Sequence, residues 1–208
     1  MYITYLAGGI ASGKSTVSRE LRKRGACCID LDEVSREVTT PGSPTNELIA
    51  REFGSNMLDD KGALKRHALA QHVFCSQERT RQLESIVHPA IKERLAQRLA
   101  AQGEDALCVV EVPLLNKVED LAKAADEIVC VLCPIEERRL RAIGRGMIGA
   151  DFDARVAQQP SDTYLVSMAD TVFLNDSNER KLIEQIDDWW DQRRKSHMEF
   201  DAVSQRIG

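Results

Sequence analysis

The feature that most constrains this chain is the run Gly-Gly-Ile-Ala-Ser-Gly-Lys-Ser at residues 8–15. It fits G-x-x-x-x-G-K-[ST], a pattern in which glycine-rich backbone curls around a phosphate and a lysine reaches the outer phosphate oxygens. The preceding segment, Ile3–Ala7, is apolar and β-prone, and the following segment, Thr16–Arg24, has helical spacing of its apolar residues and ends before Gly25. A strand, a glycine-rich loop and a helix together predict a site for a nucleoside triphosphate. The weaker alternative is a chance match in a turn.

The composition indicates what class of protein this is. The chain has 208 residues, of which 43% are hydrophobic and 29% charged, which suits one α/β domain with room for an inserted subdomain. A net charge of −5 argues against general binding of nucleic acid. There is no apolar run of about 18 residues to span a membrane and no signal sequence before the first strand, so we expect a cytoplasmic protein.

The cysteines have the pattern of core residues. Five of the six lie in or beside apolar, strand-like runs, as reduced cysteines often do. Cys130 and Cys133 have the C-x-x-C spacing of redox and zinc sites, but they lie at a strand pattern with no second ligand pair nearby. We therefore interpret them as buried structural cysteines.

Two acids end the second predicted strand, Ala26–Asp32. Residues two apart in an extended segment point the same way, so Asp30 and Asp32 are expected to point together into a cleft at the carboxyl edge of the sheet. The alternative is that Asp32 caps a helix over Glu33–Val38. A cap explains one acid and not two, so we favour a functional role for at least one of them.

Three further apolar runs complete a predicted five-stranded parallel sheet: Ala106–Val112, Asp126–Leu132 and Thr171–Leu174. Glu111 near the end of the first of these runs is a candidate acid for a Mg²⁺ shell. A final helix over about residues 179–194 carries an apolar stripe in which Trp189 and Trp190 are expected to lie in the core.

Residues 41–103 read as helices. Predicted helices cover 45–53, 65–75 and 77–87, and His88-Pro89 is expected to interrupt the last before a new helix begins. The basic residues of this stretch are more simply explained as a solvated face than as a binding surface.

An arginine-rich segment, residues 136–145, lies among glycines that give the backbone freedom. Arginines on a mobile segment can close over transferring phosphates, which favours a lid that carries Arg141 and Arg145. The alternative is an exposed amphipathic helix whose arginines pair with Glu136 and Glu137 at i,i+4.

Taken together, these residues resemble the dephospho-CoA kinases, which transfer the γ-phosphate of ATP to the ribose 3′-hydroxyl of dephospho-CoA in the last step of coenzyme A synthesis. The order of motifs carries the resemblance, since His88-Pro89 followed by Pro113-Leu114-Leu115 separates this family from adenylate- and shikimate-type kinases. The other matching positions are the 8–15 loop, Asp30 and Asp32, Pro41-Gly42, Phe53-Gly54, residues 62–66, Leu69, Leu83-Glu84, Arg155, Gln159, Ala169-Asp170 and Asn175. Another small-metabolite kinase, or a nucleotide- or CoA-binding protein with little catalysis, stays as an alternative.

The resemblance implies a P-loop NTPase fold of three layers with an inserted helical substrate subdomain and a helical lid. It divides the chain into a P-loop core (1–40, 104–135 and 166–195), a helical CoA-binding insert (41–103), a lid (136–165) and a C-terminal tail (196–208). The substrates would be ATP and dephospho-CoA, with Mg²⁺ as cofactor and with neither nucleic acid nor membrane as partner. The oligomeric state stays open.

The resemblance also implies roles for individual residues. The catalytic residues would be Lys14, Asp32 as the base, Arg141 and Arg145. ATP would be bound by Gly8, Gly9, Ile10, Ala11, Ser12, Gly13, Lys14, Ser15, Thr16 and, near the adenine, Asn175. Dephospho-CoA would be bound by Asp30, Asp32, Arg66, His88, Pro89 and Leu114. The metal would be held by Ser15 together with Asp30 or Glu111.

This sequence departs from the family pattern at several positions on the ATP side. Ala7 stands where threonine is usual, Ala11 where glycine is usual, Arg138 where glutamine is usual, and Leu165 where lysine is usual. Ala11 restricts the loop if its position needs a positive φ.

Overall fold

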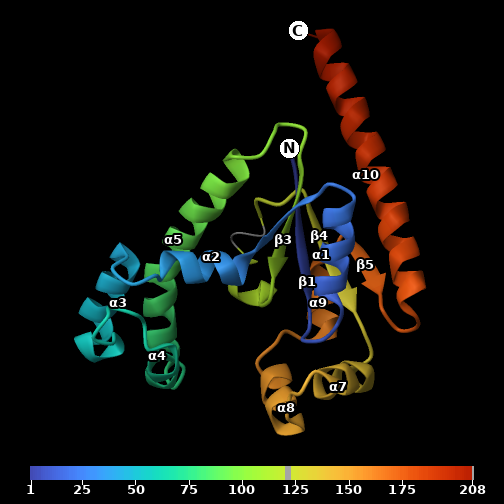
Figure 1. Cartoon of the computed structure of the whole chain (residues 1–208). Coiled ribbons are helices and arrows are strands. Elements are labelled where there is room, and N and C mark those ends of the chain that lie inside the picture. Colours follow the sequence, from blue (N-terminus) through green and yellow to red (C-terminus); the bar gives the residue numbers. More distant parts are fainter. Residues whose placement is uncertain (120–122, 208) are drawn as a thin grey trace. The chain divides into compact units, whose positions relative to one another are not determined.

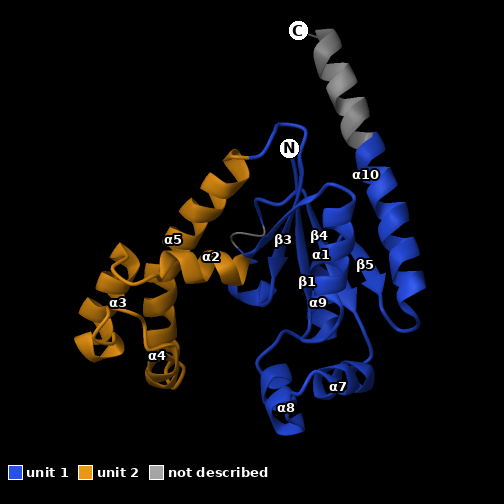
Figure 2. Ribbon diagram, viewed as in Figure 1, with its two compact units in different colours: residues 1–30, 102–208 blue, residues 31–101 orange. Residues whose placement is uncertain are grey.

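The computed structural model describes the backbone of residues 1–119 and 123–207, with side chains as far as Lys195. The chain forms two compact units, one of residues 1–30 and 102–208 and the other of residues 31–101 (Figure 2). The second unit begins at Leu31, so it includes a helix that precedes the predicted insert at 41–103. Within the described residues, no helix is both long enough and apolar enough to cross a membrane.

The first unit is built on a five-stranded sheet (Figure 1). The strands are β1 (Tyr2–Gly8), β2 (Cys27–Asp30), β3 (Leu107–Val112), β4 (Glu127–Leu132) and β5 (Thr171–Leu174). Their order is β2-β3-β1-β4-β5, and every neighbouring pair is parallel. The predicted parallel sheet of five strands is confirmed, and its central strands are buried apolar runs because helices cover both faces.

Two helices, α1 (Lys14–Lys23) and α10 (Glu179–Ile207), cover one face of the sheet. Val17 and Leu21 of α1 share one buried cluster with Leu182 and Trp189 of α10 and with apolar side chains of β1, β3, β4 and β5. Trp190 belongs to the same cluster, so both tryptophans lie in the core as predicted. The predicted tail at residues 196–208 lies outside the described side chains.

The opposite face of the sheet is covered by α9 (Asp162–Met168), where the Cys130 thiol approaches the Leu165 carbonyl at 3.4 Å. Before α9 the chain forms α7 (Ile135–Gly144) and α8 (Gly149–Ala157), and a short 3₁₀ turn, η2 (Leu115–Lys117), follows β3. Helices on both faces of a parallel sheet give the three-layer α/β architecture that the strand and helix pattern predicts.

The second unit contains only helices. These are α2 (Leu31–Val38), α3 (Pro44–Phe53), the 3₁₀ turn η1 (Ser55–Met57), α4 (Arg66–Val73) and α5 (Gln77–Ala100). Side chains at the starts of α3 and α5 cap these helices, since the hydroxyls of Ser43 and Ser76 accept hydrogen bonds from backbone N–H groups of the first turn. Its core is the cluster Ile49, Phe53, Met57, Leu69 and Val73, with Leu83, Ile86 and Val87 of α5 packed against it.

Two sequence-based expectations are wrong in this region. Helix α5 runs unbroken through His88 and Pro89 instead of ending there. Leu83, Ile86 and Val87 pack before the proline, and Ile91 and Leu95 are buried after it. This packing on both sides stabilises one continuous helix, although the proline removes one backbone hydrogen bond.

The second error concerns Asp32. Strand β2 ends at Asp30, and Asp32 lies in the first turn of α2. Asp30 and Asp32 therefore do not alternate along one extended strand, because Leu31 already has helical backbone and its side chain is buried. Asp32 is inside the helix rather than the cap before Glu33 that the alternative interpretation supposed.

Candidate active site

The glycine-rich loop connects β1 to α1 at the carboxyl end of the central strand. Gly13 begins the helix with φ of 114°, and its carbonyl accepts the N–H groups of Thr16 and Val17. The Lys14 ammonium donates to the carbonyls of Gly8 at 2.5 Å and Gly9 at 3.1 Å. The lysine charge thus lies over the loop, where the amides at a helix N-terminus attract an anion.

Ala11 has φ of 60° and is the one residue other than glycine with positive φ among the described residues. The condition under which an alanine restricts the loop, a positive φ, is therefore met at this position, because a Cβ makes the left-handed conformation unfavourable. The neighbouring Ser12 is buried, with 1% of its surface exposed. The loop consequently holds a strained conformation at its centre.

Three side chains from distant parts of the chain hold this loop in place. The Ile10 N–H donates to Gln159 Oε1 at 2.7 Å, and Arg138 Nε donates to the Ile10 carbonyl at 2.9 Å. Asn175 Nδ2 donates to the Ser12 carbonyl at 2.8 Å. Sequence reasoning noted Arg138 only as a departure from a pattern and Gln159 only as a matching position, because no local motif reveals a contact between residues more than a hundred positions apart.

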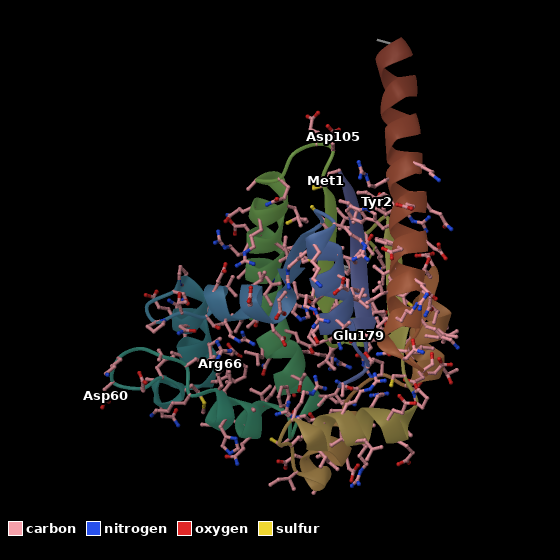
Figure 3. The ribbon with its side chains drawn as sticks, turned by 45° about the vertical axis from the view of Figure 1, so that its right-hand side comes forward. Met1, Tyr2, Asp60, Arg66, Asp105 and Glu179 are labelled. Carbon is pink, nitrogen blue, oxygen red and sulfur yellow. The ribbon has the colours of Figure 1, made fainter. Side chains whose placement is uncertain are left out.

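A pocket of about 500 Å³ lies beside the loop. Its lining includes Ala11, Gly13, Ser15 and Thr16 of the loop and the first turn of α1, together with Arg141, Arg145 and Asn175. The remaining lining residues are Gly144, Glu179 and Leu182. Figure 3 shows Glu179 at the start of α10. The structure therefore brings the loop, both predicted arginines and Asn175 to one cavity.

The two arginines lie at the end of α7, Arg141 in its last turn and Arg145 directly after it as the C-cap residue. Arg141 Nη2 donates to Glu137 Oε2 at 2.8 Å and approaches the Asn175 carbonyl at 3.4 Å, while Arg145 Nε donates to the Arg141 carbonyl at 3.2 Å. The Glu137–Arg141 pair is the i,i+4 contact of the alternative interpretation, and it occurs on a helix that also faces the pocket. Two guanidinium groups beside a phosphate-binding loop can neutralise the charge of a triphosphate.

Two acids lie side by side on neighbouring strands. Asp30 of β2 is in register with Glu111 of β3. Glu111 Oε1 lies 3.7 Å from Arg22 Nη2 of α1, which places the glutamate on the sheet face that α1 covers. The Cys28 thiol also approaches α1, at the Ser18 carbonyl, so Asp30, two residues further along β2, lies on this same face.

These groups suit a hard cation. Carboxylate and hydroxyl oxygens are the ligands that Mg²⁺ prefers, and Mg²⁺ usually takes only one or two carboxylates together with phosphate oxygens and water. The described residues contain no group of three or more His, Cys, Asp or Glu side chains that could hold a metal alone. Ser15, Asp30 and Glu111 carry oxygen donors of the kind that such a cation takes.

The predicted acceptor-side residues divide between the two units. Leu114 precedes η2 in the first unit. Asp32, Arg66, His88 and Pro89 belong to the second unit, on α2, α4 and α5. Arg66 at the start of α4 (Figure 3) donates through Nη2 to the hydroxyl of the buried Thr39 at 2.7 Å.

The second unit also has a pocket of about 550 Å³. Its lining includes Glu37, Ser43 and Arg94 but none of the four predicted substrate residues of this unit. Arg94 Nε donates to Glu37 Oε2 at 2.7 Å. Two of the charged groups at this pocket, Glu37 and Arg94, are thus paired with each other.

The cysteines are free thiols, as predicted. Cys108, Cys130 and Cys133 are buried, and burial raises the pKa of the Cys130 thiol to about 12. A protonated, buried thiol is a poor nucleophile and a poor metal ligand. The C-x-x-C spacing is therefore structural.

Comparison with known proteins identifies the family. The family model for dephospho-CoA kinase, CoaE, matches residues 2–181. The chain is 41% identical to a dephospho-CoA kinase of Anaeromyxobacter dehalogenans, with 84% of each sequence covered. It is 38% identical to a dephospho-CoA kinase of Frankia casuarinae, with 91% of this chain and 82% of the relative covered.

Solved structures of similar fold agree with this family match. The crystal structure of TT1252 from Thermus thermophilus superposes with a TM-score of 0.78 at 30% identity, covering 88% of this chain and 92% of that one. A dephospho-CoA kinase from Campylobacter jejuni superposes with a TM-score of 0.67 at 20% identity, covering 93% and 98%, which shows a shared fold. From the matched residues 2–181 and these relatives, the chain belongs to the dephospho-CoA kinase family.

Proposed function

We propose that this protein transfers the γ-phosphate of ATP to the ribose 3′-hydroxyl of dephospho-CoA, forming coenzyme A and ADP in the last step of coenzyme A synthesis. The observation that carries the proposal is the pocket in which the glycine-rich loop, Arg141 and Arg145 line one cavity, in a chain of this family. We place the reaction in the cytoplasm.

The chain's own residues supply positioning and positive charge. Phosphoryl transfer proceeds through a loose transition state with charge spread over the phosphoryl oxygens, so an enzyme gains most from fixed donors and cations. Loop amides and Lys14 bind the β- and γ-phosphates. Arg141 in the last turn of α7 and Arg145 directly after that helix both line the pocket, and they stabilise the charge that develops during transfer. Within the predicted lid, residues 136–165, the part ahead of α9 carries both arginines and acts as the lid of this proposal, since α9 itself packs on the sheet.

Asp32 acts on the acceptor. A carboxylate is a weak base for a hydroxyl, so its main task is to orient the 3′-hydroxyl and to accept its proton late in the reaction. Asp32 is exposed in the first turn of α2, so solvent and a bound acceptor can reach its carboxylate. Asp30, two residues earlier, assists in binding the acceptor or the metal.

Mg²⁺ would be held by the Ser15 hydroxyl and by Asp30 or Glu111, together with phosphate oxygens of ATP. When bound, it neutralises charge on the phosphates. The fit rests on the oxygen donors of these three side chains and on the register of Asp30 with Glu111.

The remaining residues select the substrates. Arg66, His88, Pro89 and Leu114 bind dephospho-CoA in this proposal, and Arg66 carries a positive charge suited to a phosphate group. Asn175 lies on the nucleotide side, where its amide already donates to the loop and its backbone accepts Arg141. We assign it to the border of the adenine site.

One assay tests the proposal. The purified full chain is incubated with Mg²⁺, ATP and dephospho-CoA, and coenzyme A and ADP are measured by mass spectrometry. Lys14→Met is the inactive control, because it removes a phosphate-binding charge and should lower kcat by about 10²–10³-fold. Absence of coenzyme A at high enzyme concentration would contradict the proposal. ATP binding without turnover would favour a binding protein, and ADP formation with a different acceptor would favour another small-metabolite kinase.

A further inference from the structure

The strained residue Ala11 is enclosed by hydrogen bonds on both sides. Its φ of 60° is a left-handed conformation, against which an L-residue has a preference of about 5- to 30-fold. A free loop would leave this conformation for most of the time. Something in the folded chain must therefore hold the loop where it is.

The contacts on the N-terminal side act directly on the strained bond. The φ of Ala11 describes the rotation of the Ile10–Ala11 peptide about the N–Cα bond of Ala11, and the carbonyl of that peptide accepts Arg138 Nε at 2.9 Å. The N–H of Ile10 is fixed by Gln159 Oε1 at 2.7 Å. On the other side of Ala11, the Ser12 carbonyl accepts Asn175 Nδ2 at 2.8 Å.

Arg138 is itself fixed. Its side chain is 5% exposed, and Nη1 lies 3.3 Å from Asp162 Oδ1 while Nη2 lies 3.5 Å from Gln159 Oε1. It also packs against the loop so closely that a Cβ on Gly9 would lie 2.0 Å from Nη2. The planar guanidinium therefore joins the loop, α9 and Gln159 through one rigid fork, which a lysine could not reproduce in full.

We propose that Arg138 is a positioning residue of the phosphate-binding loop, and that its hydrogen bond to Ile10, supported by Gln159 and Asn175, allows alanine to occupy the left-handed position 11. The proposal rests on the proposed function to the extent that this loop binds ATP. It makes residues 11 and 138 energetically dependent on each other. Loss of the Arg138 hydrogen bonds must cost more nucleotide affinity when residue 11 is alanine than when it is glycine, because glycine adopts positive φ without a Cβ penalty.

A double-mutant cycle tests this dependence. The wild type, Ala11→Gly, Arg138→Met and the double variant are compared by calorimetric titration with Mg·ATP, without dephospho-CoA. Arg138→Met should weaken ATP binding about tenfold with alanine at position 11 and about twofold or less with glycine there, because only alanine has a Cβ that disfavours the left-handed conformation. In steady-state assays the change should fall on the KM for ATP, with the KM for dephospho-CoA unaltered.

Arg139→Met is the matched control. Arg139 lies beside Arg138 on α7 but pairs with the exposed Asp153 on α8, so ATP affinity should stay within twofold. Equal losses whether position 11 holds alanine or glycine, or no loss with either, would overturn the proposal. If Arg138→Met does not fold, Arg138→Lys takes its place in the same cycle, with a smaller loss that must again depend on residue 11.

The experiment separates this proposal from the proposed function. ATP affinity is measured without an acceptor, so a protein that binds ATP but forms no coenzyme A would contradict the function and still decide the role of Arg138. A protein that forms coenzyme A with equal losses in both backgrounds would contradict only the role of Arg138.

Discussion

Arg193 of α10 forms two hydrogen bonds with Glu127 at the start of β4, from Nε to Oε2 at 2.7 Å and from Nη2 to Oε1 at 2.6 Å. The Glu127 side chain is 2% exposed, and it also accepts hydrogen bonds from Trp189 Nε1 at 3.1 Å and from the Thr171 hydroxyl at 2.6 Å. The Arg193 guanidinium lies over the Trp189 ring, 5.9 Å from the ring centroid. This network attaches α10 to the amino end of β4, whereas the phosphate-binding loop lies at the carboxyl end of the sheet.

Arg193→Met should lower the free energy of unfolding by about 3 kcal/mol, the lower part of the range for breaking a buried ion pair, because Glu127 would keep a buried charge without its cation. The lower part applies because Arg193 is itself 26% exposed. Urea denaturation measures the change. The neighbouring exposed residue offers a control, and Arg194→Met should stay within about 0.5 kcal/mol. Similar losses in both variants would show that the pair does not carry this stability.

The pairing of Glu127 with Arg193 also predicts how the free energy of unfolding depends on pH. Burial alone would raise the pKa of Glu127, but hydrogen bonds from Arg193, Thr171 and Trp189 outweigh it and hold the pKa below its ordinary value of 4.5. Because the pKa of Glu127 is lower in the folded than in the unfolded protein, its ionised carboxylate stabilises the fold at any pH above the unfolded-state pKa. This stabilisation is lost as the pH falls through the folded-state pKa. The stability advantage of the wild type over Glu127→Gln should therefore be constant near neutral pH and shrink below about pH 4.5. An advantage that grows on acidification would contradict the direction of the shift.

The parts of the fold that the sequence predicts well are local. Short apolar runs identify the five strands, and the 8–15 loop identifies the first strand and helix around it, because periodicity and turn chemistry act over a few residues. The position of Trp189 and Trp190 in the core also follows from the helical stripe alone. These features need no knowledge of distant partners.

The parts of the structure that the sequence does not predict depend on packing between residues far apart in the chain. The strand–helix boundary after Asp30 coincides with the burial of Leu31 and Val34 of α2. The hydrogen bond from Arg138 to the Ile10 carbonyl joins residues 128 positions apart. Neither can be read from propensity, since tertiary contacts override it. The sequence thus predicts the loop, Arg141, Arg145 and Asn175, which one pocket brings together, but it does not predict the contacts that fix the loop.

Asp32→Asn tests the proposed base. The change keeps the size of the side chain but removes the charge that orients the acceptor hydroxyl, so kcat should fall by about 10²–10⁴-fold. ATP affinity should stay within twofold, because the proposed role concerns the acceptor. Steady-state kinetics and calorimetry measure the two quantities. Glu33→Gln removes an acid from the same helical turn and should leave kcat nearly unchanged. A near wild-type rate for Asp32→Asn would refute the assignment.

Pro89→Ala should stabilise the protein and weaken acceptor binding. Pro89 is exposed inside α5 and cannot donate the backbone hydrogen bond of a helix interior, which costs about 3 kcal/mol, while its rigid ring restricts the unfolded chain by up to about 1 kcal/mol. The free energy of unfolding should therefore rise by about 2 kcal/mol in urea denaturation.

If Pro89 contributes to the dephospho-CoA site, the KM for that substrate should rise in the same variant while the KM for ATP does not. Arg81→Ala, at an exposed position of α5, should change neither quantity appreciably. A Pro89→Ala protein that gains stability with unchanged kinetics would remove this residue from the acceptor site, and one that loses stability would show that the ring stabilises α5 by packing.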